Sequence, residues 1–421
     1  MGALDFPYFS AKPYMTKPTT CFSLDNGLRC VHRQVPGAAD CCGVIIDAGS
    51  RDEPTPDQGL AHFVEHTIFK GTSRRKSWHI INRMESVGGE LNAYTTKEST
   101  AVYTLAPRGN LARSVELLAD LIASSSFPAA ELDKEREVVA DEIDSYLDMP
   151  SEAVIDEFDE LFFAGNPLAH NILGTEKTVA TFKSADCRRW LDTRYSPSRM
   201  VFFYSGAMNV RQVAQCVSRH FSALNRTEHP LMRTQPDAVA PFDAERPVGS
   251  HQAHTLMGCP IGGMGSDDRF AMSLLTNIVG GPGMNSLLNV ALRERRGLVY
   301  NVEAMTTRYT DCGVFAVYFG CDHADTRQCT DLTLDIISSL RTQPLTPRRL
   351  LAAKRQFAGQ LALASENREN DALAMGKAVL YHGSVLEPSE MRRRIDELTA
   401  DDLYRCAQQL DPARFSRLTL C

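Results

Sequence analysis

The sequence lacks the features that identify membrane-spanning and nucleic-acid-binding proteins. No uninterrupted apolar stretch approaches the roughly 18 residues that a membrane helix requires, and no long basic run occurs. With a net charge of -7, the chain has no general electrostatic attraction for phosphate backbones or anionic membranes. We therefore expect no nucleic-acid partner and no membrane association.

Disulfide frameworks and targeting signals are also missing. The twelve cysteines are scattered and include no Cys-x-x-Cys pair, which favours free thiols in a reducing compartment. The amino terminus has no basic segment followed by a sustained apolar stretch, and Phe6 stands where a myristoylation signal requires Ser or Thr. These absences predict a cytoplasmic protein, unless the sequence is an already processed form.

A chain of 421 residues is longer than one hydrophobic core usually organises, so we expect two or more domains. Residues 227–249 carry four prolines and little apolar periodicity, as is typical of a connecting segment. This segment divides the chain into predicted domains of residues 1–226 and 250–421.

The two predicted domains look like diverged copies of each other. In each, an AVY segment begins a strand that an amphipathic helix follows, at 101–122 and again at 316–337. A second pair of helical segments, 131–143 and 349–361, has similar length and follows a proline-containing turn in both cases.

Strand-like runs such as 41–50 and 200–208 alternate with helical segments, several of which are consecutive. This mixture predicts the α+β class rather than a regular βαβ barrel. The expected fold is therefore two homologous domains, each with a mixed or antiparallel sheet covered by helices.

The stretch GLAHFVEHTIFKGT contains His62, Glu65 and His66 within five positions. On a helix, the two histidines are four residues apart and leave the same face, so they can converge on one ion. Glu65 lies near the same edge, where it reaches a metal-bound water rather than the metal. Catalytic zinc normally takes three protein ligands and a water, so a third ligand is needed. The alternative is a partly buried helix that uses both histidines for hydrogen-bonded packing.

The segment EREVVADEIDSYLD offers the third ligand. Glu135 and Glu142 are seven residues apart and lie two helical turns along one face. The usual interpretation of such a charged run is a solvated acidic helix. The apolar VVA between the two acids indicates instead that one side of this helix is buried.

His62-x-x-Glu65-His66, followed 76 positions later by Glu142, resembles the inverted zinc motif of the pitrilysin and insulinase family, which includes mitochondrial processing peptidase. The resemblance covers essentially the whole chain. It extends to GGELNAYTTKESTAVY, NPLAHNILGTEKTV, RYSPSRMVFFYSGAM and, in the second domain, LRERRGLVYNV.

The resemblance implies that His62, His66 and Glu142 bind one Zn²⁺ per chain. It implies that Glu65 is the general base and that Glu135 orients a histidine ligand.

The remaining family roles fall on both domains. Asn92 and Ala93 would lie on an edge strand that pairs with the substrate backbone, and Arg293 and Tyr300 would reach the site from the second domain. Two acids, Glu152 and Asp156, match positions where processing-peptidase-like members receive an arginine near the scissile bond. Solvated acids on a helix are an equally good interpretation of that pair.

The function that the resemblance implies is a zinc-dependent endopeptidase, which hydrolyses unfolded peptides bound as an added β-strand in a chamber between domains. Long-chain members contain four such domains, so this chain is expected to form a homodimer or a heterodimer with a related subunit. The alternative is a non-catalytic or partner-dependent subunit of a processing-peptidase-like complex. The second domain offers no metal site, because 271–281 contains no histidine and Gln360, placed against Glu142, is not anionic.

Overall fold

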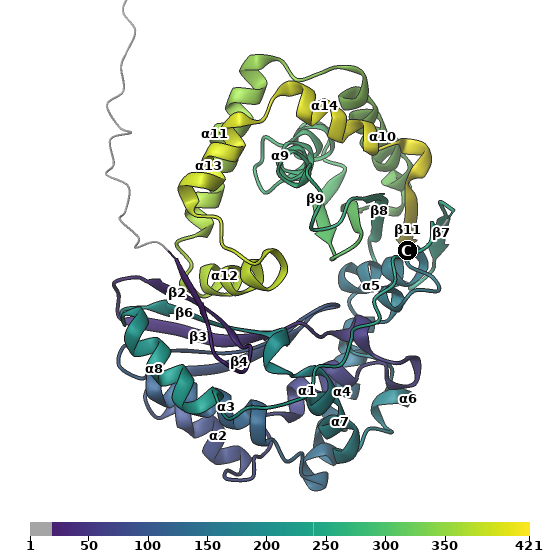
Figure 1. Ribbon diagram of the computed structural model, residues 1–421. Helices are drawn as coiled ribbons and strands as arrows, with labels where there is room; N and C mark the ends of the chain where they lie inside the picture. Colours follow the sequence, from purple (N-terminus) through teal and green to yellow (C-terminus); the bar gives the residue numbers. More distant parts are fainter. Residues whose placement is uncertain (1–18, 239) are drawn as a thin grey trace, which may run out of the picture.

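The computed structural model describes residues 19–238 and 240–421, and it contains two sheets (Figure 1). The segment searched for amino-terminal targeting signals lies almost wholly outside the described residues. The first sheet has the spatial order β1 (Thr20–Ser23), β2 (Arg29–Gln34), β6 (Met200–Gly206), β3 (Ala39–Ile46), β5 (Thr100–Pro107) and β4 (Glu90–Thr95). The second has the order β7 (Asp243–Arg246), β11 (Ser416–Leu420), β8 (Ala253–Ile261), β10 (Gly313–Cys321) and β9 (Val299–Arg308).

Both sheets are mixed, and their central strands are covered on both faces. Every residue of β6 and β10 is buried, which explains why these strands read as continuous apolar runs rather than as alternating patterns. The pairs β2–β6 and β7–β11 are parallel, and the other pairs are antiparallel. The order β2-β6-β3-β5-β4 therefore recurs as β7-β11-β8-β10-β9, so the α+β fold with two homologous sheets is confirmed.

Helices cover the outer face of each sheet (Figure 1). The core of the first sheet includes residues of α1 (Leu60–Thr67), α2 (Ser77–Glu85), α3 (Leu111–Ser124), α4 (Ala129–Leu147), α7 (Ser184–Arg194) and α8 (Val210–Phe221). The core of the second sheet includes residues of α9 (Arg269–Gly280), α10 (Thr326–Thr342), α11 (Pro347–Ala364) and α14 (Ala400–Gln409).

The two halves exchange one helix each. Helix α12 (Arg368–His382) comes from the second half, yet it packs on the inner face of the first sheet. Helix α5 (Pro150–Phe162) comes from the first half and packs on the second sheet, beside β8 and β11. Each half therefore buries apolar surface that only the other half can cover.

The predicted connecting segment needs one correction. Residues 243–246, which lie inside the expected 227–249 linker, form β7 and pair in parallel with β11. Since β7 takes the place that β2 has in the first sheet, the second sheet begins before residue 250. The sequence DAER has no apolar alternation, so local pattern could not identify this edge strand.

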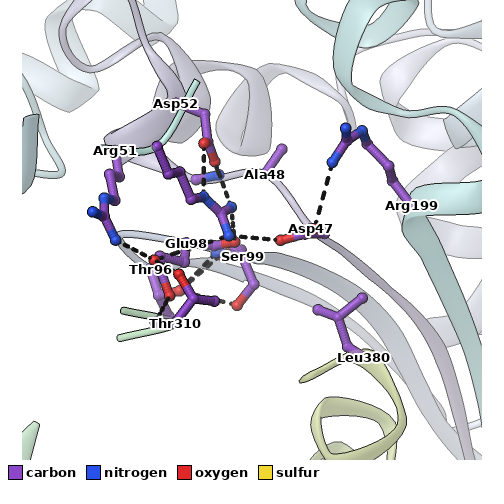
Figure 2. A network of polar contacts seen from close by, with 12 residues as sticks. Asp47, Ala48, Arg51, Asp52, Thr96, Glu98, Ser99, Arg199, Thr310 and Leu380 are labelled. Carbon is purple, nitrogen blue, oxygen red and sulfur yellow. Dashed lines mark hydrogen bonds and ion pairs between the residues drawn. The ribbon is translucent and has the colours of Figure 1, made fainter. Parts of the chain in front are cut away.

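A buried polar network joins the turn after β4 to the turn after β9 (Figure 2). Arg51 donates to Glu98 at 2.6 Å, and its two terminal nitrogens also donate to the Asp311 carboxylate at 2.8 and 2.7 Å. Glu98 in turn accepts from the backbone nitrogen and the hydroxyl of Thr310 at 2.9 and 2.7 Å. The connecting segment contributes Arg233, whose guanidinium donates to the Glu98 carbonyl at 3.0 Å. The network thus fixes one half against the other.

Helix α5 carries a half-buried acid with an altered pKa. Burial raises the pKa of Asp159 to about 6, although Lys97 Nζ, 4.0 Å away, opposes the shift. Because the folded-state pKa exceeds the ordinary value of 3.8, folding favours the protonated form. The contribution of Asp159 to the free energy of unfolding is therefore complete below about pH 4, and it is lost as the pH rises through 6.

We expect Asp159→Asn to remove this pH dependence. Between pH 4 and 6.5 the native chain should lose up to about 3 kcal/mol of unfolding free energy that the variant keeps. Urea unfolding at several pH values measures the difference. Asp331→Asn on α10, where the acid is exposed, is the matched control. Parallel stability curves for the native chain and Asp159→Asn would contradict the prediction.

Candidate metal centre

Helix α1 begins at a tightly constrained glycine and a buried carboxylate. Gly59 adopts a left-handed conformation with φ of 91°, and a Cβ there would lie 2.6 Å from the carbonyl oxygen of Leu173. Glu53 accepts from the backbone nitrogens of Gly59 and Ala61 at 2.8 and 2.7 Å. The carboxylate therefore satisfies free amide groups at the positive end of the helix.

Three side chains from α1 and α4 converge, and they are the ones that the family resemblance implies as metal ligands. Ligand atoms of His62, His66 and Glu142 all lie within 4.8 Å of one another. Glu142 Oε2 is 3.7 Å from His62 Nε2 and 3.4 Å from His66 Nε2. The four-residue spacing on α1 aims both rings to one side, and the packing of α4 against α1 brings in the carboxylate.

This donor set fits zinc. Two imidazole nitrogens and one carboxylate oxygen are the ligands of many catalytic zinc sites, which leave a fourth position for water. Burial, with a further contribution from His66, lowers the pKa of His62 to about 3. The His62 ring is therefore neutral at physiological pH and has a nitrogen lone pair available for a metal.

Glu135 holds one of the two histidines. Its Oε2 lies 3.3 Å from His66 Nδ1, and its Oε1 lies 2.5 Å from Lys70 Nζ. An Nδ1 proton donated to Glu135 leaves His66 Nε2 free to bind a metal, so this contact selects the required tautomer. The orienting role of Glu135 stays a prediction, and the contact with Lys70 adds a residue that the sequence analysis did not single out.

Glu65 lies on the same helix but outside the converging group of ligand atoms. Burial raises the pKa of its carboxyl, while Thr95 and His66 oppose the shift. Thr95 is the last residue of β4, so Glu65 stands between the ligand group and this strand. A carboxyl in that position can exchange protons with a group held beside the metal.

Among the described strands, β4 lies at the end of the first sheet and pairs with β5 alone. Asn92 and Ala93 are half-buried residues of this strand, and they pair with Tyr103 and Val102 of β5. Helix α1 contacts β4, and Thr95 at the end of β4 interacts with Glu65, so this strand lies beside the helix that holds both histidines. An edge of this kind can pair with an extended peptide.

The second-half candidates are exposed. Tyr300 lies on β9, the edge strand that corresponds to β4, and its side chain is 63% exposed. Arg293 lies in a short π-helical turn, Asn289–Glu294, and is also exposed. Among the described residues neither side chain makes a hydrogen bond or ion pair, so their catalytic roles stay predictions.

The two acids on α5 differ in their surroundings. Asp156 accepts from Asn171 Nδ2 at 3.0 Å, whereas Glu152 is exposed and its carboxylate has no hydrogen-bond partner among the described residues. A role in binding a substrate arginine stays a prediction for both.

The second half holds an amide pair in place of the metal centre. Helices α9 and α11 pack together as α1 and α4 do, and Asn277 Nδ2 donates to Gln360 Oε1 at 2.8 Å. Neutral amides bind zinc poorly compared with imidazole and carboxylate groups. In this half the two helices therefore pack together as in the first half, but the residues between them are amides rather than zinc ligands.

Comparison with protein families identifies the class. Residues 31–176 match the family model described as "Insulinase (Peptidase family M16)", and residues 181–357 match the model described as "Peptidase M16 inactive domain". An uncharacterized zinc protease of Streptomyces coelicolor is 30% identical over 400 residues, which cover 92% of this chain and 86% of that protein. The chain belongs to the insulinase family, peptidase family M16.

Other relatives agree with this assignment. An uncharacterized zinc protease of Bacillus subtilis is 30% identical over 93% of this chain and 94% of its own length. The β subunit of the mitochondrial-processing peptidase of Lentinula edodes is 28% identical over 93% of this chain and 87% of its own. The crystal structure of a Helicobacter pylori protease has the same fold, with a TM-score of 0.89, 20% identity, and coverage of 96% of this chain and 99% of that one. Two of these relatives are thus named zinc proteases.

Among the described helices, none combines the length and the apolar character needed to cross a bilayer.

Proposed function

We propose that this chain is a zinc-dependent endopeptidase. The observation that carries the proposal is the convergence of His62, His66 and Glu142, with Glu65 beside them and Glu135 oriented toward one histidine. The relatives named zinc proteases support the same chemistry at the level of the family.

Each protein group has a distinct role in the proposed reaction. A zinc ion bound by His62, His66 and Glu142 would activate a water and polarise the scissile carbonyl. Glu65 takes a proton from the attacking water and delivers it to the leaving nitrogen. Tyr300, from the second half, donates a hydrogen bond to the developing oxyanion, and Arg293 helps to bind the substrate.

The proposed substrates are unfolded peptides or oligopeptides in an extended conformation. Their backbone adds to the free edge of β4 beside Asn92 and Ala93, within a chamber between the two halves. Glu152 is free to receive a basic side chain, whereas Asp156 is already bonded to Asn171. We therefore expect charge reversal at Glu152 to change the cleavage of arginine-containing peptides more than charge reversal at Asp156.

The surface near Glu142 supports an oligomeric enzyme. Val138 and Tyr146 lie one helical turn on either side of Glu142 and are exposed, and Leu147 at the end of this helix and Met149 just after it are exposed as well. We propose that a second copy, or a related subunit, covers this surface. The competing function is a non-catalytic or partner-dependent subunit, since one relative is itself named as a subunit.

Metal analysis and a cleavage assay on the purified chain test these proposals. The endopeptidase proposal predicts about one zinc per chain and cleavage of an unstructured peptide, with loss of both in His66→Ala. Light scattering identifies the oligomer. Native protein without zinc and without activity would support the non-catalytic function, and activity only after addition of a second protein would support the partner-dependent one.

We expect Glu135→Gln to weaken zinc binding by about 10- to 100-fold, because the neutral amide orients His66 and raises its basicity less well than the carboxylate. Competition with a zinc chelator measures the affinity. Glu137→Gln is the matched control, since Glu137 lies on the same helix and is exposed. Equal zinc affinities in the two variants would show that Glu135 has no influence on the metal.

A further inference from the structure

A large cleft lies away from the metal centre. It is bounded by α9, α11, α12 and α13 (Pro388–Glu397), has a volume of about 1010 Å³, and includes none of the metal-ligand candidates in its lining. Its apolar lining includes Met264, Phe270, Leu361, Met375, Leu386 and Ile395. The volume is at the upper end of the range for small-molecule sites.

The lining of the cleft includes five arginines and one aspartate. Four of the arginines have carboxylate partners: Arg33 with Asp371 at 2.7 Å, Arg308 with Asp268 at 3.5 Å, Arg392 with Asp396 at 2.7 Å, and Arg394 with Glu390 at 3.0 Å. Arg269 has no carboxylate within 4 Å among the described residues, and its Nη1 donates only to the Ser266 carbonyl, at 3.3 Å. Arg269 is therefore the uncompensated cation of the cleft.

An aromatic ring, two further arginines and a histidine lie near Arg269. The Phe270 ring lies 4.7 Å from the Arg269 guanidinium carbon and 5.3 Å from that of Arg394, so one aromatic ring supports both. Arg308 is already paired, since its Nη2 lies 3.5 Å from the Asp268 carboxylate. Burial and the charge of Arg269 both lower the pKa of His382, which also lines the cleft. Within this group Arg269 is therefore the guanidinium that lacks a carboxylate partner among the described residues.

We propose that this cleft binds a small monocarboxylate with an apolar tail. The carboxylate pairs with the guanidinium of Arg269, whose planar donors match two carboxylate oxygens. The tail packs along Phe270, Met375 and Ile395. The proposal is independent of the peptidase reaction, since the cleft shares no residue with the metal centre.

Calorimetric titration of the full chain with decanoate, below its micellar concentration, tests the proposal. Decanoate should bind at least 10-fold more tightly than decanol, which has the same tail without the charge, and decylamine should not bind. Arg269→Met should weaken decanoate binding at least 10-fold. Ala374→Trp should weaken it as well, because Ala374 is an exposed residue of α12 that lines the cleft and a Trp there fills the space for the tail.

Arg327→Met is the matched control, since Arg327 is 94% exposed on α10 and lies outside the cleft. Its affinity for decanoate should equal that of the native chain. Equal affinities for decanoate and decanol, or an unchanged affinity in Arg269→Met, would overturn the proposal. Should Arg269→Met fail to fold, Ala374→Trp decides the result by itself.

Discussion

Replacement of Glu65 by Gln is expected to abolish peptide hydrolysis while the chain keeps its zinc. Gln has nearly the same shape as Glu but cannot take a proton from water, so the loss in kcat/KM should be about 10²- to 10⁴-fold. The metal should remain, because the converging ligand atoms belong to His62, His66 and Glu142. Cleavage kinetics on an unstructured peptide and the zinc content of the same sample measure the two effects together.

Glu85→Gln is the matched control for this change, because Glu85 ends the neighbouring helix α2 and is exposed. It should retain both activity and metal. Full activity in Glu65→Gln would place the general base elsewhere, and loss of zinc would make Glu65 a ligand. Either result would require a different assignment of the residues on α1.

Local sequence pattern predicted the half of the metal centre that lies on one helix. The spacing of His62 and His66 determines their shared direction once a helix forms, and it was sufficient without tertiary information. Glu142 is different, because spacing shows only that it shares a helix face with Glu135. The approach of that face to α1 depends on packing between helices, and the family resemblance supplied it in advance.

The supporting residues could not be predicted from the sequence. Glu53 stands seven positions before α1, so it lies outside the window in which helix-capping signals are recognised. The exchange of α5 and α12 was also missed. An amphipathic pattern shows that a helix has an apolar face, but it does not show which of two similar sheets that face will cover. Because the two sheets have the same strand order, a helix pattern alone cannot decide between them.

The polar network between Arg51, Glu98 and the second half also depends on how the two halves pack, so local sequence pattern does not predict it. Glu98 follows β4 by three positions, so the contacts that it makes with the second half also hold the end of the candidate substrate strand. Its side chain is 2% exposed and that of Arg51 is 1% exposed. Charges so thoroughly removed from water are stable only as a complete set.

Glu98→Gln is therefore expected to lower the free energy of unfolding by about 3–5 kcal/mol, because it leaves the buried Arg51 without this carboxylate and sets an amide against the donors of Thr310. Urea unfolding followed by the fluorescence of buried Trp190 measures the change. Glu397→Gln is the control, since Glu397 forms an exposed ion pair with Arg393 and should change the stability by about 0.5 kcal/mol or less. Equal effects of the two substitutions would show that the buried network contributes no more than a surface pair. A large effect of Glu98→Gln alone would establish the joint between the halves as a main source of the stability of the fold.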